Sequence, residues 1–396
     1  MRAQDLALQR DKYRHLSDEE WRWLLQQVEG RERTADKLPA FAAIEDWWYP
    51  VRLSCEQCSS ETTARYKAQI INGTSADGKC LDLTGGYGVD TYFLSERFAH
   101  TDYVEQNAEL CRIMEHNVAI SHRQSAISVH NTTAEDFLPT AGKYDLIYID
   151  PYRRDAHGGK VFRLEDCTPN VVELLPTLLQ HLTSDGRLML KLSPMLDISL
   201  AISQLSSINF QLNWDVHVVA VKNEVKEVLL LSCQKSAISS QNSDVSHQLS
   251  AITAIDLAEP EKAFGFVKEE EMTCSPSLFS IPLSSSAFLY EPNAAILKAG
   301  AYKLVGERFG LHKADINTHL YFSDHLITAF PGRIWKILEQ NPAKRKELAQ
   351  ANVLTRNYPM TPEQLKKKLH LRDGGTAFII GLRIGGKPTL LLAERV

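Results

Sequence analysis

Short apolar runs alternate with helix-like segments from Lys79 onward, and this alternation is the main structural signal of the chain. Continuous apolar runs are typical of strands buried on both faces, whereas apolar residues three or four positions apart indicate helices. The predicted strands are 80–83, 101–105, 128–131, 144–150 and 186–192. The predicted helices between them are 89–97, 108–119 and 170–181. This order predicts an α/β fold with a parallel sheet wound with helices.

Two β-branched runs, 216–221 and 228–233, follow the last of these strands and are joined by the polar segment 222–227. Such a pair is typical of a closing hairpin, so we expect one antiparallel strand in an otherwise parallel sheet. The next stretch, 235–248, is rich in Ser, Gln and Asn and has almost no side chain to bury. It is predicted to be a linker.

The N-terminal part has a helical pattern. Ser17 and Glu20 have the spacing of a capping box and precede apolar residues at helical intervals. A second helix start is predicted at Ser59 and Ser60. We therefore expect an N-terminal helical domain over 1–68, which ends where the sheet-forming pattern begins.

Beyond the linker the pattern predicts small α+β modules. The predicted elements are a helix at 293–309, a strand at 318–323, a helix at 361–370, and a hairpin of 376–382 with 388–393 around Gly385 and Gly386.

Composition places the chain among ordinary globular proteins. Of its 396 residues, 44% are hydrophobic and 23% are charged, which suits more than one domain. The seven cysteines are scattered and odd in number, and no apolar run reaches the length of a membrane span or an export signal. We therefore expect a cytoplasmic protein with reduced thiols and no membrane contact.

The formal net charge of -5 hides a basic C-terminal part. Residues 301–372 hold thirteen Lys and Arg against six Asp and Glu, including the runs 344–346 and 366–368. Basic runs of this kind are often only solvated helix faces. The alternative is a surface that contacts the phosphates of a nucleic acid.

A glycine-rich turn is the strongest chemical signal. Asp82, Thr84, Gly85, Gly86 and Gly88 lie where a predicted strand runs into a helix, and glycines there let a ligand approach the backbone. The same glycines can serve a tight bend alone.

Two further positions strengthen the interpretation as a ligand site. Glu105 ends the next predicted strand, where an acid can accept hydrogen bonds from ribose hydroxyls. Ala134 and Glu135 follow the third strand, where they would line the edge of an adenine pocket. Together these residues predict a nucleoside cofactor.

The fourth predicted strand ends in Asp150, Pro151 and Tyr152, followed by Arg153 and Arg154. Ligands of open α/β sheets bind at such carboxyl ends. Asp150 and the Pro151 carbonyl can accept hydrogen bonds from an amino group of a base, Tyr152 can stack on that base, and the arginines can hold phosphates. The alternative is a plain Asp-Pro turn whose arginines pair with nearby acids.

Lys191, at the end of the fifth strand, and Glu224, in the last hairpin, would lie on the same rim and are candidate substrate contacts. A lysine and acids on one rim also resemble sites that methylate a ribose hydroxyl. Cys55 and Cys58 lack the second ligand pair of a zinc site, so no metal is predicted. No cysteine lies near Asp150 in the sequence. This favours transfer of a methyl group to nitrogen or oxygen over methylation of carbon through a covalent cysteine intermediate.

The chain resembles bacterial class I S-adenosylmethionine-dependent methyltransferases that carry a ferredoxin-like segment and a C-terminal THUMP-like domain. The matching strings are 56–61 with Tyr66 and Lys67, 82–90, 150–154, 290–294 with 298–300, and 356–359. The resemblance implies a Rossmann-like methyltransferase domain at 69–255, a ferredoxin-like segment at 285–324 and a THUMP-like domain at 325–396. It also implies S-adenosyl-L-methionine as cofactor and, since THUMP domains bind tRNA, an RNA substrate.

The chain departs from the usual pattern at three points: Thr84 replaces a glycine, Thr133 replaces a common acid, and one proline rather than two follows Asp150. Four functions therefore stay open. They are an RNA methyltransferase, a methyltransferase of proteins or small molecules, a nicotinamide-dependent dehydrogenase, and a non-catalytic RNA-binding factor. The sequence leaves the oligomeric state open.

Overall fold

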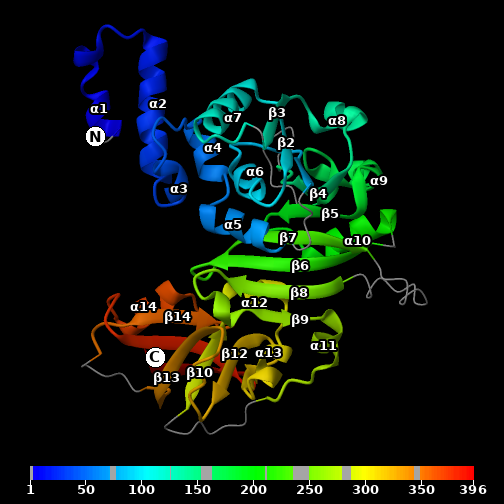
Figure 1. Ribbon diagram of the computed structural model, residues 1–396. Coiled ribbons are helices and arrows are strands. Elements are labelled where there is room, and N and C mark those ends of the chain that lie inside the picture. The colour runs from blue at the N-terminus through cyan, green and yellow to red at the C-terminus, as the bar shows by residue number, and fades with distance from the viewer. Residues whose placement is uncertain are drawn as a thin grey trace. The chain divides into compact units, whose positions relative to one another are not determined.

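The computed structural model describes residues 3–71, 77–124, 126–152, 163–209, 212–234, 249–278, 287–342 and 348–396 (Figure 1). The predicted linker 235–248 and the basic run 344–346 lie outside these ranges. The chain forms two compact units. The first comprises Met1–Trp214 and Leu229–Gln248, and the second comprises Asp215–Val228 and Leu249–Val396.

The first unit begins with helices. They are α1 (Ala3–Ala7), α2 (Asp18–Thr34), α3 (Pro39–Ala42), α4 (Arg52–Gln57) and α5 (Glu61–Gln69). Both predicted starts are confirmed, because the Ser17 side chain accepts from the Glu20 amide in a capping box and the Ser60 side chain accepts from the Thr63 amide. The predicted helical N-terminal region is therefore present.

A mostly parallel sheet follows, with the strand order β3-β2-β1-β4-β5-β7 in this unit. Its strands are β1 (Lys79–Asp82), β2 (His100–Glu105), β3 (Ile127–Asn131), β4 (Tyr144–Ile149), β5 (Leu182–Leu192) and β7 (Glu224–Gln234). Its helices are α6 (Val89–Leu94), α7 (Ala108–Ile120), α8 (Ala134–Phe137), α9 (Val171–Gln180) and α10 (Ile198–Ile208). The pairings of β1 with β2 and β4, of β2 with β3, and of β4 with β5 are parallel, as predicted.

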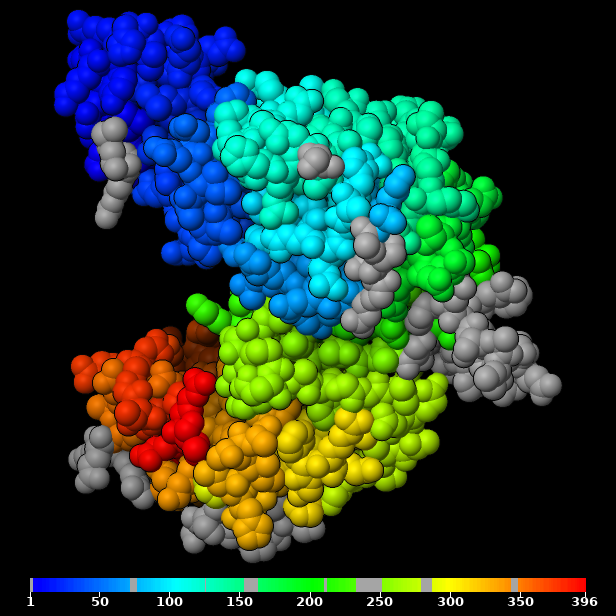
Figure 2. All heavy atoms as spheres, viewed as in Figure 1, coloured from blue at the N-terminus to red at the C-terminus, as the bar shows by residue number. Residues whose placement is uncertain are grey.

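An aromatic cluster joins the N-terminal helices to the sheet-bearing part. Phe41 stacks on Trp47 with ring centroids 4.2 Å apart, and both pack among buried residues of α6 and α7. Figure 2 shows the blue N-terminal residues lying against the cyan residues of this part. Burial of such large side chains stabilises each by roughly 1.5–3 kcal/mol, so the helices are an integral layer of the unit.

The closing hairpin is tighter than predicted. Strand β6 (Leu212–Val221) and β7 are joined by Lys222 and Asn223 alone, both with positive φ, and not by the six-residue loop 222–227. Two residues with positive φ form the turn whose twist matches antiparallel strands. Residues 224–227 were misassigned because β7 begins with a mainly polar stretch in which exposed side chains alternate with half-buried and buried ones. The predicted antiparallel strand is β7.

The second unit also contains β8 (Leu249–Asp256), β9 (Phe264–Phe266) and α11 (Lys268–Thr273), which the sequence did not predict. A seven-stranded sheet follows in the order β11-β12-β10-β13-β16-β15-β14. Its strands are β10 (Phe288–Pro292), β11 (His312–Asp315), β12 (Thr318–Ser323), β13 (Gly332–Gln340), β14 (Asn352–Arg356), β15 (Ala377–Ile384) and β16 (Lys387–Arg395).

Three helices complete this unit, α12 (Ala294–Ala299), α13 (Leu304–Arg308) and α14 (Pro362–Leu369). The prediction of one helix over 293–309 was wrong, because Gly300 adopts φ +84 and ends α12. The predicted last helix and the hairpin around Gly385 are confirmed. Among the described helices, none is both long and apolar enough to cross a membrane.

Candidate active site

The glycine turn between β1 and α6 packs tightly on its neighbours. A Cβ added at Gly85 would lie 2.1 Å from the Tyr103 ring, and one at Gly88 would lie 2.5 Å from the Met114 sulfur. Gly86 differs, since it has φ +55 and meets only a carbonyl at 3.8 Å. Gly85 and Gly88 therefore seat the turn on β2 and α7, while Gly86 borders open space.

This difference predicts unequal effects of alanine at two adjacent glycines. Gly85→Ala should destabilise the protein by about 1–3 kcal/mol through overpacking, and it should weaken cofactor binding by displacing the turn. Gly86→Ala should cost about 1 kcal/mol, from left-handed backbone strain. Thermal unfolding together with a cofactor titration measures both effects. Equal losses in the two variants would contradict the assignment of Gly85 to packing.

The turn also receives a contact from the N-terminal region, from the segment between α3 and α4. Trp47 Nε1 donates to the hydroxyl of Tyr87, which is the residue between Gly86 and Gly88, at 2.9 Å. Tyr103 donates to the Gly86 carbonyl at 2.6 Å. Side chains of the protein itself thus hold the backbone of the turn, and a preorganised site lowers the entropy cost of binding.

Glu105, the predicted ribose ligand, lies beside the predicted Gly86. Its Oε2 accepts from the Gly86 amide at 2.9 Å and its Oε1 accepts from the Asn107 amide at 2.8 Å. A carboxylate has about four acceptor positions, so lone pairs remain for two hydroxyl donors. The half-buried Glu105 beside the uncrowded Gly86 therefore suits a ligand with hydroxyl donors, such as a nucleoside.

The proposed adenine contacts begin close by. Asn131, at the end of β3, donates to the Glu105 carbonyl at 3.0 Å, so the segment that leads to α8 starts beside Glu105. In the first turn of α8, Ala134 is buried and Glu135 is exposed. Contact of either residue with a cofactor stays a prediction.

Asp82 and Thr84 connect the turn to the catalytic candidate. The buried carboxylate of Asp82 accepts from the Thr84 amide at 3.0 Å and from the Thr91 hydroxyl at 2.6 Å. Thr84 Oγ1 in turn accepts from the Asp150 amide at 2.7 Å. The threonine that replaces a glycine thus ties the ends of β1 and β4 together.

The pKa of Asp82 leads to a pH-dependent stability. Burial raises this pKa to about 7, against hydrogen bonds from Thr91 and Thr84 that lower it. Between its unfolded value, about 4, and about 7, the folded protein binds more protons, so the free energy of unfolding should fall as pH rises. Asp82→Asn should remove this slope in urea unfolding at pH 4.5 to 7. The exposed Asp185→Asn is the control, and an unchanged slope in Asp82→Asn would contradict the prediction.

The fold brings Asp150 and Lys191 together at the carboxyl ends of β4 and β5. Lys191 Nζ lies 2.5 Å from Asp150 Oδ2. Pro151 is buried, whereas Tyr152 is 53% exposed. The Tyr152 backbone exchanges two hydrogen bonds of 3.0 Å with Thr168, so the backbone that carries the exposed ring is held in place.

Three other predicted substrate contacts cannot be placed at this site. Arg153 and Arg154 lie outside the described residues. Glu224 belongs to the second unit, where it is exposed and pairs with Lys226 at 2.7 Å. The roles of these three residues stay predictions.

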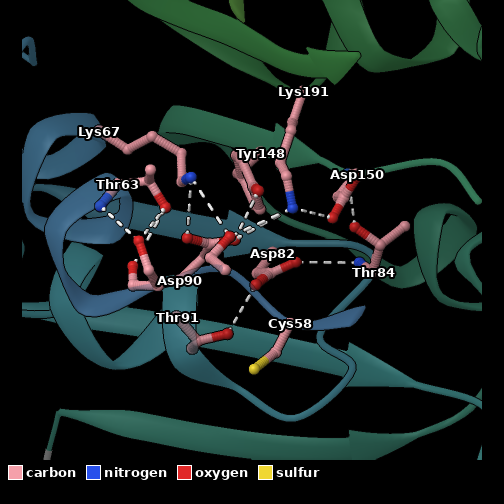
Figure 3. Close-up of polar contacts among 12 residues, drawn as sticks. Cys58, Thr63, Lys67, Asp82, Thr84, Asp90, Thr91, Tyr148, Asp150 and Lys191 are labelled. Carbon is pink, nitrogen blue, oxygen red and sulfur yellow. Dashed lines mark hydrogen bonds and ion pairs between the residues drawn. The ribbon is translucent and has the colours of Figure 1, made fainter. Parts of the chain in front are cut away.

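A buried network behind Lys191 was missed by the sequence analysis (Figure 3). Its members are Ser59, Lys67, Asp90 and Tyr148. Asp90 Oδ2 accepts from Ser59 and from Tyr148, each at 2.7 Å, and Asp90 Oδ1 lies 3.2 Å from the fully buried Lys67 ammonium. One signal was available, since Lys67 lies on the same helix face as the buried residues Thr63 and Ala64.

The network keeps Asp90 ionised. Burial favours the neutral acid, but Lys67 and Lys191 and the hydrogen bonds from Ser59 and Tyr148 outweigh it and lower the pKa of Asp90. An ionised, hydrogen-bonded carboxylate can stabilise two ammonium groups in a medium of low dielectric constant. The described residues include no group of three or more His, Cys, Asp or Glu side chains that could hold a metal ion.

Comparisons with known proteins concern the domains and the family of the chain. Residues 288–331 match a ferredoxin-like domain and residues 332–395 match a THUMP-like domain. The crystal structure of a candidate methyltransferase from Porphyromonas gingivalis W83 is 32% identical and has a TM-score of 0.81, covering 96% of this chain and 92% of that one. Two uncharacterized S-adenosylmethionine-dependent methyltransferases, from strains CDC 1551 and H37Rv of Mycobacterium tuberculosis, are 21% identical, over 92% of this chain and 93% of theirs.

Proposed function

The chain belongs to the family of class I S-adenosylmethionine-dependent methyltransferases that end in a ferredoxin-like and a THUMP-like domain, and we propose that it methylates RNA at a nitrogen or oxygen. The THUMP-like domain at 332–395 is the observation that carries the choice of RNA, because THUMP domains bind tRNA. The site supports a planar substrate, since Tyr152 presents an exposed ring next to Asp150.

The cofactor site in this proposal is formed by the glycine turn and Glu105. Gly86 offers open space and a fixed backbone, Glu105 offers acceptors for the ribose hydroxyls, and Ala134 and Glu135 lie toward the base. When bound, S-adenosylmethionine supplies a methyl carbon whose bond to sulfur breaks with both electrons left on sulfur, while the acceptor lone pair forms the new bond. The acceptor must also release its proton.

The chain itself supplies position and charge. Asp150 accepts a hydrogen bond from the acceptor group, and Tyr152 holds the ring that carries this group. Both are fixed by backbone hydrogen bonds, from Asp150 to Thr84 and between Tyr152 and Thr168. Such positioning converts a bimolecular encounter into a step within one complex.

Transfer of labelled methyl groups tests the proposal. Purified protein is incubated with methyl-labelled S-adenosylmethionine and bulk RNA from cells that lack the gene, and label in the RNA is counted. Loss of label after ribonuclease treatment and with Asp150→Ala would support an RNA methyltransferase. Absence of label, with cofactor binding confirmed separately, would favour a protein or a small molecule as substrate.

The basic helix α14 gives a prediction about RNA binding. Lys367 and Lys368 are exposed in its last turn, whereas Lys366 pairs with Asp373 at 2.5 Å. Replacing both exposed lysines by Ala should weaken RNA binding and lower the slope of log K against log[salt] by about 1 for each phosphate that is no longer neutralised. Cofactor affinity should not change. The control variant, Lys12→Ala with Lys79→Ala, removes the same charge from the first unit. Equal weakening of RNA binding by both pairs of substitutions would show that α14 carries no specific RNA-binding surface.

A further inference from the structure

Lys191 donates two hydrogen bonds to oxygen atoms and forms an ion pair with a third oxygen. Its Nζ lies 2.5 Å from Asp150 Oδ2, 3.1 Å from Ser59 Oγ and 4.0 Å from Asp90 Oδ2. An ammonium group has three protons and no lone pair. The side chain is 13% exposed, so water competes little for these protons.

The groups that face Lys191 balance its charge. Two ammonium groups, of Lys67 and Lys191, face two carboxylates, of Asp90 and Asp150. Burial raises the pKa of Asp82 to about 7, so this carboxyl can add only negative charge, and burial also raises the pKa of the Cys58 thiol, which favours its neutral form. The remaining neighbour, the Tyr148 hydroxyl, donates to Asp90. The net charge of these side chains is therefore closest to zero when Lys191 is protonated.

Asp150 keeps one oxygen for a ligand. Its Oδ2 is taken by Lys191, and among the described residues none donates to Oδ1. The carboxylate side chain is 38% exposed, compared with 10% for Asp90. An incoming donor can therefore reach Asp150 but not the carboxylate behind it.

We propose that Ser59, Asp90 and Lys67 are positioning residues that hold Lys191 as an ammonium, and that the methyl acceptor is consequently an N–H group of an RNA base rather than a ribose hydroxyl. This inference rests on the proposed function. A hydroxyl must lose its proton as it attacks, and neither an ammonium nor a carboxylate paired with it is basic enough to take that proton.

A nitrogen acceptor can be methylated with a weaker base in the site than a hydroxyl requires. Its lone pair forms the N–C bond while the carbon–sulfur bond breaks and sulfur keeps that electron pair. The nitrogen is then cationic and acidic, and its proton passes to Oδ1 of Asp150 and on to solvent. A weak base suffices for this order of events, which matches the paired Asp150.

The charge state of Lys191 can be tested without the cofactor. The purified protein is treated with isotope-labelled acetic anhydride at pH 7 to 10, and acetylation of each lysine is measured by mass spectrometry. Lys226, which is partly exposed and pairs with Glu224, serves as internal reference. We expect Lys191 to stay unreactive where Lys226 is half acetylated. Ser59→Ala should raise its reactivity about tenfold, the equivalent of one hydrogen bond to a charged group.

Ser207→Ala, at an exposed serine, is the matched control and should leave Lys191 unchanged. Circular dichroism confirms that each variant is folded. Two results would contradict the proposal that the network holds Lys191 as an ammonium. They are acetylation of wild-type Lys191 to the same extent as Lys226, and unchanged reactivity of Lys191 in Ser59→Ala.

The acceptor atom is identified from the product. Methylated RNA is digested to nucleosides, and mass spectrometry distinguishes a methylated base nitrogen from a 2′-O-methyl ribose. Base methylation supports the inference. Ribose methylation overturns it and leaves the proposed function intact, whereas unlabelled RNA contradicts the proposed function while the acetylation result still stands.

Discussion

Replacement of Asp150 by alanine is expected to lower kcat for methyl transfer by about 10²- to 10⁴-fold, the range typical of a positioned proton acceptor. The variant loses the oxygen that we propose orients the acceptor, and it also leaves the Lys191 ammonium without its 2.5 Å partner. The backbone contact from the Asp150 amide to Thr84 is independent of the side chain, so the glycine turn should stay in place.

Single-turnover kinetics with labelled S-adenosylmethionine measure this effect, and calorimetry measures cofactor affinity in parallel. Asp150→Asn retains an acceptor oxygen without the charge, and its kcat should lie between those of the wild type and Asp150→Ala. A large loss of cofactor affinity in Asp150→Ala would mean that Asp150 serves the cofactor site, and an unchanged kcat would remove it from the reaction.

Lys67→Met is expected to destabilise the first unit by about 3–5 kcal/mol, because it removes the nearer of the two ammonium groups that pair with a buried carboxylate. Lys67 is fully buried and lies 3.2 Å from Asp90 Oδ1, and the side chain of Asp90 is only 10% exposed. Methionine preserves most of the volume of lysine, so the loss reports on charge rather than on a cavity. Urea unfolding followed by Trp fluorescence measures the change.

Two comparisons separate this effect from general loss of packing. Lys226→Met removes an ammonium from an exposed pair and should change stability by less than about 1 kcal/mol. The double variant Lys67→Met with Asp90→Leu removes both charges and should recover part of the loss. A double variant less stable than Lys67→Met would argue that Asp90 has structural partners, Ser59 and Tyr148, that matter more than the ion pair.

The local sequence determined most of the secondary structure and the broad position of the site. Apolar periodicity located β1 to β5, and capping residues located the starts of α2 and α5, because both signals depend on neighbours a few positions away. The rule that ligands bind at the carboxyl ends of parallel strands selected Asp150 and Lys191, which the structure places 2.5 Å apart.

Only the tertiary structure decided what lies behind that pair. Ser59 and Lys67 belong to the helical region that the sequence separated from the catalytic domain, yet they contact Asp90 and Lys191. The pattern of a helix shows which face is buried but not what it meets, and a buried ammonium is tolerated only where folding brings a carboxylate to it. The same limit explains why the turn at Lys222 and Asn223 was not predicted. The amides of both residues donate hydrogen bonds to the carboxylate of Asp256, which is distant in sequence. Local propensity fixes elements, whereas burial of charge and closure of long loops depend on contacts that form only in the folded chain.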